Sequence, residues 1–302
     1  MSQRNRRIAI LADRGILPAG PLRFPYARLM TSSMVRDALA EDGANSDITS
    51  IATILSERRA RCSMIARQDG VIAGIALARE AFKLRDPRAS VRAAVKDGQN
   101  IVAGTPVMFV TGHARGLLSA ERVALNYMQR LSGIATLTRQ FVDAVKGTKV
   151  KILDTRKTTP GWRRLEKYAV RAGGGMNHRM DLESAVLIKD NHIAALGGDV
   201  AMAVMRSREV AAPGTAIEVE CDNIDQVRAA LEAHPDIIML DNMTPPRLRD
   251  AVALIDGRAV TEASGGVTLE TVREIADTGV DWVSVGALTH SAKAFDLALD
   301  FQ

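Results

Sequence analysis

The sequence predicts a two-domain α/β protein, in which a small α+β domain precedes a domain of alternating strands and helices. The chain has 302 residues, of which 47% are hydrophobic and 25% charged, as is typical of a globular protein with a full core. Its first half mixes short strand patterns with helical ones. Beyond Lys149 a strand-then-helix pattern repeats, which favours parallel strands joined by crossover helices.

Residues 1–30 contain three prolines and show no helical or strand period, so we expect an N-terminal arm. Asp13 and Arg14 interrupt the early apolar run, which is too short for a signal peptide, and no run approaches the ~18 residues of a membrane span. Cys62 and Cys221 are the only cysteines, too few for a disulfide framework. We therefore expect a cytoplasmic protein that has no membrane partner.

The positive charge is concentrated in one segment. Between Lys151 and His192 there are nine Lys or Arg against five Asp or Glu, which is +4 of the whole-chain charge of +5. The pI near 9.4 would suit nucleic-acid binding, but only 4% of residues are aromatic and no nucleic-acid-binding motif is present. We expect a small anionic substrate and no nucleic-acid partner.

The first domain is expected to cover residues 31–130. Thr31 or Ser32 is a suitable N-cap for the first helix. Asp69-Gly70 lies between two short apolar runs, which predicts the turn of a β-hairpin. The region therefore predicts helices packed on a small sheet.

A long helical pattern runs from Ser119 to Val145 and is expected to bridge the two domains. An interruption is predicted around Ser132-Gly133. Arg122 lies in this region, where its simplest interpretation is an ion pair on the helix surface.

The second domain is expected to cover residues 131–290. Helical patterns separate several short apolar runs that predict buried parallel strands. These runs are Val150–Leu153, Ala185–Ile188, Ala216–Val219, Ile237–Leu240, Arg258–Thr261 and Trp282–Val285. They fit an open doubly wound sheet or a barrel, and we favour the barrel because the strand ends look equivalent rather than paired about one crevice.

Cationic side chains follow the first two of these strands. Arg156 and Lys157 come after the first strand, and Lys189 follows the second. His178 and Arg179 stand between them, after three glycines. In a barrel these groups meet at the C-terminal rim, where Arg and Lys suit a carboxylate or a phosphate.

The later strand ends carry carboxylates and glycine turns. Ser264-Gly265 and Gly286 precede helices, so their backbone N–H groups could bind phosphate. Glu220 and Asp241, placed among phosphate-binding groups, indicate contacts to Mg²⁺ or to ribose hydroxyls. The rim as a whole predicts a site for a phosphorylated sugar and a carboxylate-bearing partner.

Three sequence motifs at the predicted rim are the most specific: TRKTTPG at 155–161, GGGMNHR at 173–179 and LIKDNH at 187–192. Others are ERVALNYMQRLSGIATLT, EVE at 218–220, LDN at 240–242, ASGG at 263–266 and VGALTHS at 285–291. Together these motifs resemble the quinolinate phosphoribosyltransferase (decarboxylating) family, also called nicotinate-nucleotide pyrophosphorylase. The resemblance runs in order from about Val35 to the C-terminus.

The resemblance implies an N-terminal α/β sandwich domain and a C-terminal open, incomplete α/β barrel. It implies a homodimer or higher homo-oligomer in which the N-terminal domain of one subunit covers the barrel mouth of its partner. Residues 291–302 are expected to form a C-terminal helix that packs back on the N-terminal domain.

The resemblance also implies an activity, the transfer of phosphoribosyl from phosphoribosyl pyrophosphate to quinolinate with decarboxylation. The implied quinolinate ligands are Arg122 from the partner subunit, Arg156, His178, Arg179 and Lys189. Phosphoribosyl pyrophosphate would contact Lys157, Glu220, Asp241, Ser264, Gly265, Gly286 and His290. Lys157, Lys189, Glu220 and Asp241 would be catalytic, and the last two would face Mg²⁺, which is held largely by substrate phosphates.

Two alternatives stay open at this point. A relative with the same fold could use a different acceptor, as nicotinate-using transferases and proteins of molybdenum-transport loci do, although four cations suit a dicarboxylate better. A barrel lyase could use Lys189 as a Schiff base. The sequence also departs from the family at Met176, where a polar residue is expected.

Overall fold

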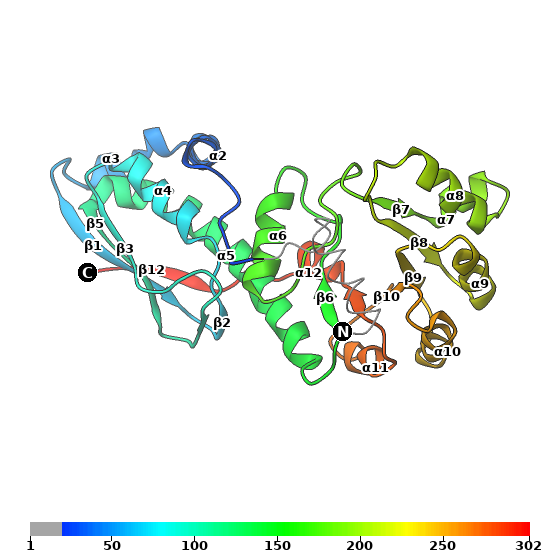
Figure 1. Ribbon diagram of the computed structural model, residues 1–302. Coiled ribbons are helices and arrows are strands. Elements are labelled where there is room, and N and C mark those ends of the chain that lie inside the picture. The colour runs from blue at the N-terminus through cyan, green and yellow to red at the C-terminus, as the bar shows by residue number, and fades with distance from the viewer. Residues whose placement is uncertain (1–19) are drawn as a thin grey trace. The chain divides into compact units, whose positions relative to one another are not determined.

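The computed structural model describes residues 20–302, which divide into two compact units (Figure 1). The sheet unit comprises Leu22–Arg139, Arg164–Gly174 and Ser291–Gln302. The barrel unit comprises Gln140–Arg163 and Gly175–His290. Most of the predicted arm lies outside the described residues.

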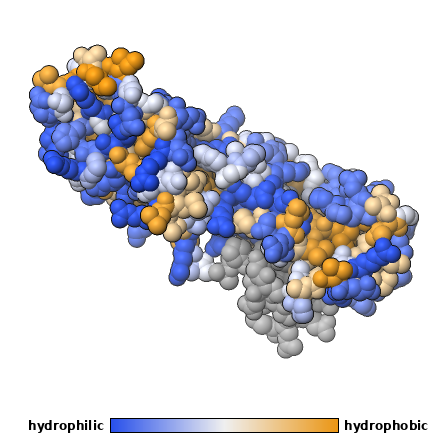
Figure 2. All heavy atoms as spheres, turned by 90° about the horizontal axis from the view of Figure 1, so that it is seen from above, coloured by the Kyte–Doolittle hydropathy of each residue, from blue (hydrophilic) through white to orange (hydrophobic). Residues whose placement is uncertain are grey.

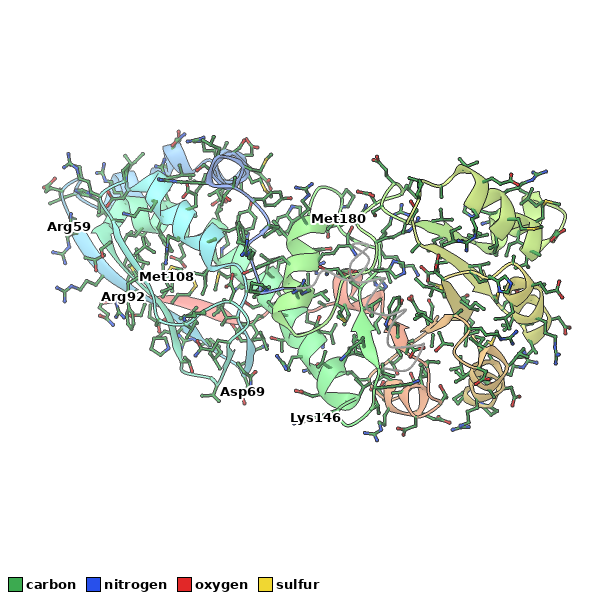
Figure 3. The ribbon with its side chains drawn as sticks, in the orientation of Figure 1. Arg59, Asp69, Arg92, Met108, Lys146 and Met180 are labelled. Carbon is green, nitrogen blue, oxygen red and sulfur yellow. The ribbon has the colours of Figure 1, made fainter. Side chains whose placement is uncertain are left out.

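The sheet unit is built on a 4-stranded antiparallel sheet in the order β12-β1-β5-β3. Its strands are β1 (Arg59–Ala66), β3 (Ser90–Ala93), β5 (Pro106–His113) and β12 (Leu297–Phe301). A separate 2-stranded sheet joins β2 (Gly70–Val71) to β4 (Asn100–Ile101). Met108 of β5 is fully buried, and the Arg92 guanidinium carbon of β3 lies 4.5 Å from the Phe109 ring centroid (Figure 3).

Helices form a second layer against this sheet (Figure 1), the α/β sandwich that the resemblance implied. The helices of this unit are α2 (Arg28–Glu41), a 3-10 turn (Ala44–Ser46), α3 (Ile48–Thr53), α4 (Ile75–Arg85), α5 (Ala114–Ala144) and α6 (Arg163–Ala172). Of these, α6 does not lie over the sheet (Figure 1). Helix α2 begins before Thr31 and Ser32, so neither is its N-cap as predicted. Thr31 instead donates from its hydroxyl to the Ala27 carbonyl (3.1 Å).

Helix α5 is continuous through Ser132-Gly133, so the predicted interruption is wrong. These small residues serve packing. Ser132 Oγ accepts from the Ala73 N–H (3.0 Å), and a Cβ at Gly133 would collide with the Lys293 carbonyl. The expected domain boundary at 130/131 falls inside this helix.

Two further predictions in the sheet unit are wrong. The strands on either side of Asp69-Gly70 do not form a hairpin, because β5 and β12 occupy both edges of β1 and β2 pairs with β4. The expected C-terminal helix over 291–302 is instead the strand β12, which pairs with β1 from Cys62↔Phe301 to Ala66↔Leu297. Without β12, one edge of β1 would leave its backbone N–H and C=O groups unpaired, and a helix could not pair with them.

The barrel unit contains a 6-stranded parallel sheet in the order β6-β11-β10-β9-β8-β7. The strands are β6 (Lys151–Leu153), β7 (Val186–Ile188), β8 (Ile217–Cys221), β9 (Ile237–Asp241), β10 (Val260–Ser264) and β11 (Trp282–Ser284). All of the strands predicted beyond Lys149 are confirmed.

The strand order confirms an open barrel rather than a doubly wound sheet. The first strand, β6, pairs with the last, β11, so the sheet curls back on itself. On the other side of β6, Leu153 forms a parallel bridge with Met176. The sheet ends at β7 among the described residues, and there the barrel is open.

Helices between the strands cover the outside of the barrel (Figure 1). They are α7 (Asp190–Ala195), α8 (Val200–Val210), α9 (Ile224–Glu232), α10 (Pro245–Ile255), α11 (Val272–Ala276) and α12 (Ala287–His290). Sequence signals explain their starts. Asp199 accepts from Met202 N–H at the start of α8, Asn223 accepts from Gln226 N–H at the start of α9, and prolines open α10.

The barrel interior changes from apolar to ionic along the strands. An apolar cluster at the strand starts comprises Leu153, Ala185, Ala216, Ile237, Val260 and Trp282, and Met176 packs against it. Because alternate residues share a face, Glu218 of β8 and Glu262 of β10 form the next level, with Glu220 and Ser264 beyond them. This packing accounts for an apolar residue at position 176.

No helix in the described part of the chain is long and apolar enough to cross a membrane. Orange patches in Figure 2 mark the apolar side chains that remain exposed. Among the exposed large apolar side chains are Leu29, Ile48 and Leu55 of the sheet unit and Leu182 and Val210 of the barrel unit.

The strand β12 should contribute directly to the stability of the sheet unit. Leu297 is 3% exposed, so Leu297→Ala is expected to lower the free energy of unfolding by about 2–5 kcal/mol. On the same strand, the exposed Asp300 pairs with Arg67, and Asp300→Ala should cost no more than about 1 kcal/mol. Chemical denaturation measures both, and equal losses would contradict the packing role of β12.

Candidate active site

A cavity of ≈ 540 Å³ lies at the C-terminal ends of the barrel strands. Polar and charged side chains line it together with two apolar ones. The lining residues are Thr155, Arg156, Lys157, His178, Arg179, Leu187, Lys189, Glu220, Met239, Asp241, Asn242, Ser264, Gly265, Gly266 and Ser284. The predicted rim is therefore one continuous site.

The turn after β6 brings two cations to the cavity. Lys157 N–H donates to Thr155 Oγ1 (3.1 Å), and Thr158 N–H donates to the Arg156 carbonyl (2.9 Å). The Thr289 hydroxyl donates to the Lys157 carbonyl (2.8 Å). These bonds hold the backbone of the turn, so that Arg156 and Lys157 both reach the cavity.

A loop anchored by Asp154 places Arg179. Asp154 is fully buried, and it accepts from Asn177 Nδ2 (2.6 Å) and from the His178 N–H (2.9 Å). Arg179 is 5% exposed and donates from Nη1 to the Ala185 carbonyl (2.9 Å). Burial lowers the pKa of Arg179 and the nearby Arg156 lowers it further. An anion in the cavity would relieve this strain between like charges.

Both nitrogens of the His178 ring face groups of the protein. Nδ1 accepts from the Arg179 N–H (2.8 Å), and Nε2 lies 3.0 Å from Glu218 Oε2 and 3.6 Å from Glu262 Oε1. The Ser284 hydroxyl donates to Glu262. Burial and the charge of Glu218 raise the pKa of the Glu262 carboxyl well above its ordinary value.

Two sets of groups could be considered as metal ligands. In the described part of the chain, His178, Glu218 and Glu262 have ligand-type atoms within 4.8 Å of one another. Because Nδ1 of His178 accepts a hydrogen bond, Nε2 carries the proton in the neutral ring and is not a ligand. Glu220 and Asp241 face the cavity and offer the carboxylate oxygens that suit Mg²⁺.

Opposite charges meet at the rim. Lys189 Nζ lies 3.1 Å from Glu220 Oε2 and its side chain is 48% exposed. Burial raises the pKa of Glu220, Lys189 lowers it, and Asp241 raises it again. Asp241 accepts from Asn242 Nδ2 (2.6 Å). The two carboxylates are thus close enough to interact, and a cation stands beside them.

Two glycines allow close approach at the rim. Gly265 has φ +95°, and a Cβ there would overlap the Asn242 side chain. A Cβ at Gly286 would lie 3.2 Å from both His290 Nε2 and Lys157 Cδ. Tight packing and a positive φ thus require glycine at 265, whereas at 286 a side chain would press on the His290 and Lys157 side chains.

The structure brings together most of the predicted site residues. Those that line the cavity are Arg156, Lys157, His178, Arg179, Lys189, Glu220, Asp241, Ser264 and Gly265. Gly286 and His290 lie next to Lys157 rather than on the cavity wall. Arg122 is exposed on α5 of the sheet unit.

Sequence reasoning assigned no role to several residues that build the site. They are Asp154, Asn177, Glu218, Asn242, Glu262 and Ser284. A signal for Glu218 existed, since a residue two before Glu220 on a strand shares its face. The roles of Asp154 and Asn177 depend on a bridge between separate strands and carry no local signal.

An open α/β barrel with Arg, Lys, carboxylates and glycine turns at its C-terminal rim defines an enzyme that acts on anionic, phosphate-bearing substrates. The chain belongs to the quinolinate phosphoribosyltransferase family. The model of that family's N-terminal domain matches residues 47–132, and that of its C-terminal domain matches residues 134–300.

Curated relatives cover nearly the whole chain. A probable nicotinate-nucleotide pyrophosphorylase [carboxylating] from Bacillus subtilis is 43% identical, over 90% of this chain and 93% of the relative. The nicotinate-nucleotide pyrophosphorylase [carboxylating] from Mycobacterium leprae is 47% identical, over 88% of this chain and 95% of its own.

Solved structures agree in fold. The nicotinate-nucleotide pyrophosphorylase from Francisella tularensis superposes with a TM-score of 0.86 at 37% identity, covering 93% of this chain and 99% of its own. The enzyme of the same name from Ehrlichia chaffeensis has a TM-score of 0.85 at 41% identity, with coverage of 90% and 98%.

The ion pair at the rim should control the protonation of Glu220. Because Lys189 lowers the pKa of Glu220, Lys189→Met is expected to raise it further. NMR titration of carboxyl-labelled glutamate measures the change. The exposed Lys151 of β6 provides the control, since Lys151→Met should leave the Glu220 titration unchanged. An unaltered Glu220 pKa in Lys189→Met would contradict the pairing.

Proposed function

We propose that the chain transfers phosphoribosyl from phosphoribosyl pyrophosphate to the ring nitrogen of quinolinate with loss of CO₂. The products are nicotinate mononucleotide, CO₂ and pyrophosphate, and the reaction supplies NAD biosynthesis. Family membership supports this assignment. The observation that carries it is the cavity in which Arg156, Arg179 and Lys189 face Glu220 and Asp241.

Quinolinate carries two adjacent carboxylates, and we assign them to the cations of the cavity. Arg156 and Arg179 each offer a planar fork that can bind a carboxylate through two hydrogen bonds, and Lys189 adds a point charge. His178 lines the same wall, but its ring nitrogens face the protein. We therefore assign it to holding Arg179 beside the substrate.

Phosphoribosyl pyrophosphate would occupy the rest of the rim. Lys157 is the cation placed for the pyrophosphate, with His290 and Gly286 beside it. Ser264 ends β10 and Gly265 follows it in the cavity lining, where their turn could bind a phosphate group. The next helix, α11, begins only at Val272, so the prediction that these residues directly precede a helix is wrong. These assignments keep the two anionic substrates on different cations.

The chemistry follows from the charges. Departure of pyrophosphate leaves positive character on the ribose C1, which the carboxylates of Glu220 and Asp241 would stabilise while Lys157 binds the leaving group. The quinolinate nitrogen attacks C1, held in line by the cations on its carboxylates. The carbon–carbon bond to the adjacent carboxylate then breaks, its electron pair moves toward the pyridinium, and the ring carbon takes up a proton.

We propose Mg²⁺ as the metal of this site. Glu220 and Asp241 supply oxygen ligands that fit it, although Lys189 engages one oxygen of Glu220. When bound, the ion would neutralise charge on the pyrophosphate.

We also propose that the active unit is a homodimer or higher homo-oligomer with shared sites. Arg122 supports this, because it is exposed on α5 and outside the cavity lining of its own barrel unit. In a shared site it would supply the remaining cation for quinolinate. We place the enzyme in the cytoplasm, where the free thiols of Cys62 and Cys221 would stay reduced.

The Schiff-base alternative does not suit the geometry. A Schiff-base lysine must attack a carbonyl through a free amine, whereas the Lys189 Nζ is engaged by the Glu220 carboxylate at 3.1 Å. A different acceptor such as nicotinate has only one carboxylate. It would leave one of the cavity's cations without an anionic partner.

The first test is an assay for nicotinate mononucleotide from quinolinate, phosphoribosyl pyrophosphate and Mg²⁺. We expect product with the wild-type protein, and a loss of about 100-fold or more in turnover for Arg179→Ala and Lys189→Ala. Circular dichroism should show that both variants are folded. Wild-type-like turnover in either variant would refute the assignment of that cation.

Mixing two inactive variants tests the shared site. Arg122→Ala and Lys189→Ala alter different halves of the proposed site, so each alone should be inactive. After unfolding and refolding together in equal amounts, random pairing gives hybrids with one intact site, and about a quarter of the wild-type sites should return. No recovery, with hybrids present on native mass spectrometry, would contradict sharing.

A further inference from the structure

A cluster of buried carboxylates lies beneath the cavity, outside the groups assigned to the substrates. Asp154, Glu218 and Glu262 are 0%, 2% and 0% exposed. Burying a carboxylate is unfavourable unless hydrogen bonds or a counter-charge compensate it. The groups that each of the three carboxylates contacts therefore indicate its function.

Asp154 holds the backbone of the loop that carries Arg179. One oxygen accepts from Asn177 Nδ2 and the other from the His178 N–H, at 2.6 and 2.9 Å. The Asp154 N–H in turn donates to the Met176 carbonyl (3.1 Å). Asp154 thus joins the end of β6 to this loop through both its backbone N–H and its carboxylate.

Glu218 contacts the His178 side chain of the same loop. Its Oε2 lies 3.0 Å from His178 Nε2, while His178 Nδ1 accepts from the Arg179 N–H. The ring is therefore fixed between a strand of the barrel and the backbone of the residue that faces the substrate. Glu262, which accepts from Ser284, lies 3.6 Å from the same Nε2 on the other side.

Charge also links this cluster to Arg179. The burial of Arg179 and the proximity of Arg156 lower its pKa, and Glu218 opposes both effects. Burial and the charge of Glu218 raise the pKa of Glu262. The cluster thus lies close enough to Arg179 for their charges to interact.

We propose that Asp154 and Glu218, with Glu262 beside them, are positioning residues that hold Arg179 through the Asn177–His178 loop in the orientation that binds the substrate carboxylate. This inference rests on the proposed function. None of the three carboxylates lines the cavity. Their effect is to fix the Arg179 guanidinium in advance, so that little of the binding energy is spent on ordering the loop.

The test uses Asp154→Asn and Glu218→Gln in the full-length protein, with Asp281→Asn as the matched control. Asp281 is another buried carboxylate of the barrel, 3% exposed, and it accepts from Thr261 at the start of β10, away from the cavity. We expect the KM for quinolinate to rise by about 10- to 100-fold in the first two variants. The KM for phosphoribosyl pyrophosphate should stay within about threefold of the wild-type value. The control should lower the melting temperature and leave both KM values unchanged.

A double-mutant cycle separates positioning from general destabilisation. If Asp154 acts through Arg179, then Asp154→Asn should reduce kcat/KM much less in an Arg179→Ala background than in the wild type. Glu218→Gln should behave in the same way, which keeps the test open if one variant does not fold. Calorimetric titration of quinolinate should show the same pattern in the dissociation constant.

Full additivity with Arg179→Ala, or an equal rise in both KM values, would overturn the proposal. So would variants that differ from wild type only in melting temperature, as the control should. Failure of the wild-type protein to use quinolinate would instead refute the proposed function, and the two failures are therefore distinguishable.

Discussion

The burial of carboxylates inside a parallel barrel is the constraint on which the rest of the site depends. Asp154 and Glu218 stand where water cannot solvate them, so the protein itself must supply their hydrogen bonds and counter-charges. Asp154 accepts hydrogen bonds from the Asn177 side chain and the His178 N–H, and Glu218 lies 3.0 Å from the His178 ring. The buried carboxylates, which would destabilise an ordinary core, are here bonded to the loop that places Arg179 at the cavity.

The change from apolar to ionic along the strands explains how one domain can be both stable and reactive. At the strand starts, Trp282, Ile237 and their neighbours form a core without polar groups. At the strand ends, Lys189 and Glu220 hold each other in a half-exposed ion pair that is worth little on its own. An anionic substrate can therefore displace it at small cost, while the core below remains unchanged.

Strands and charged strand ends were predictable because they rest on local signals. Each barrel strand is a short apolar run, and the polar residue that stops it also marks the rim. The wrong predictions concern long-range pairing. Asp69-Gly70 has the composition of a hairpin turn, but the edges of β1 are taken by distant strands, one of them from the C-terminus. Likewise Ser132-Gly133 has the composition of a helix break, but Gly133 is needed because the distant Lys293 carbonyl packs directly against it.

The fold class, the barrel strands and the motifs that carry Arg156, Lys157, Arg179 and Lys189 depend on residue type and spacing along the chain, so they could be predicted. The contacts that hold these cations in place became visible in the folded protein. The bridge of Leu153 to Met176 brings Asp154 to the His178 loop, and barrel closure brings Glu218 and Glu262 to the same imidazole. These contacts join residues far apart in sequence, and no periodicity records them.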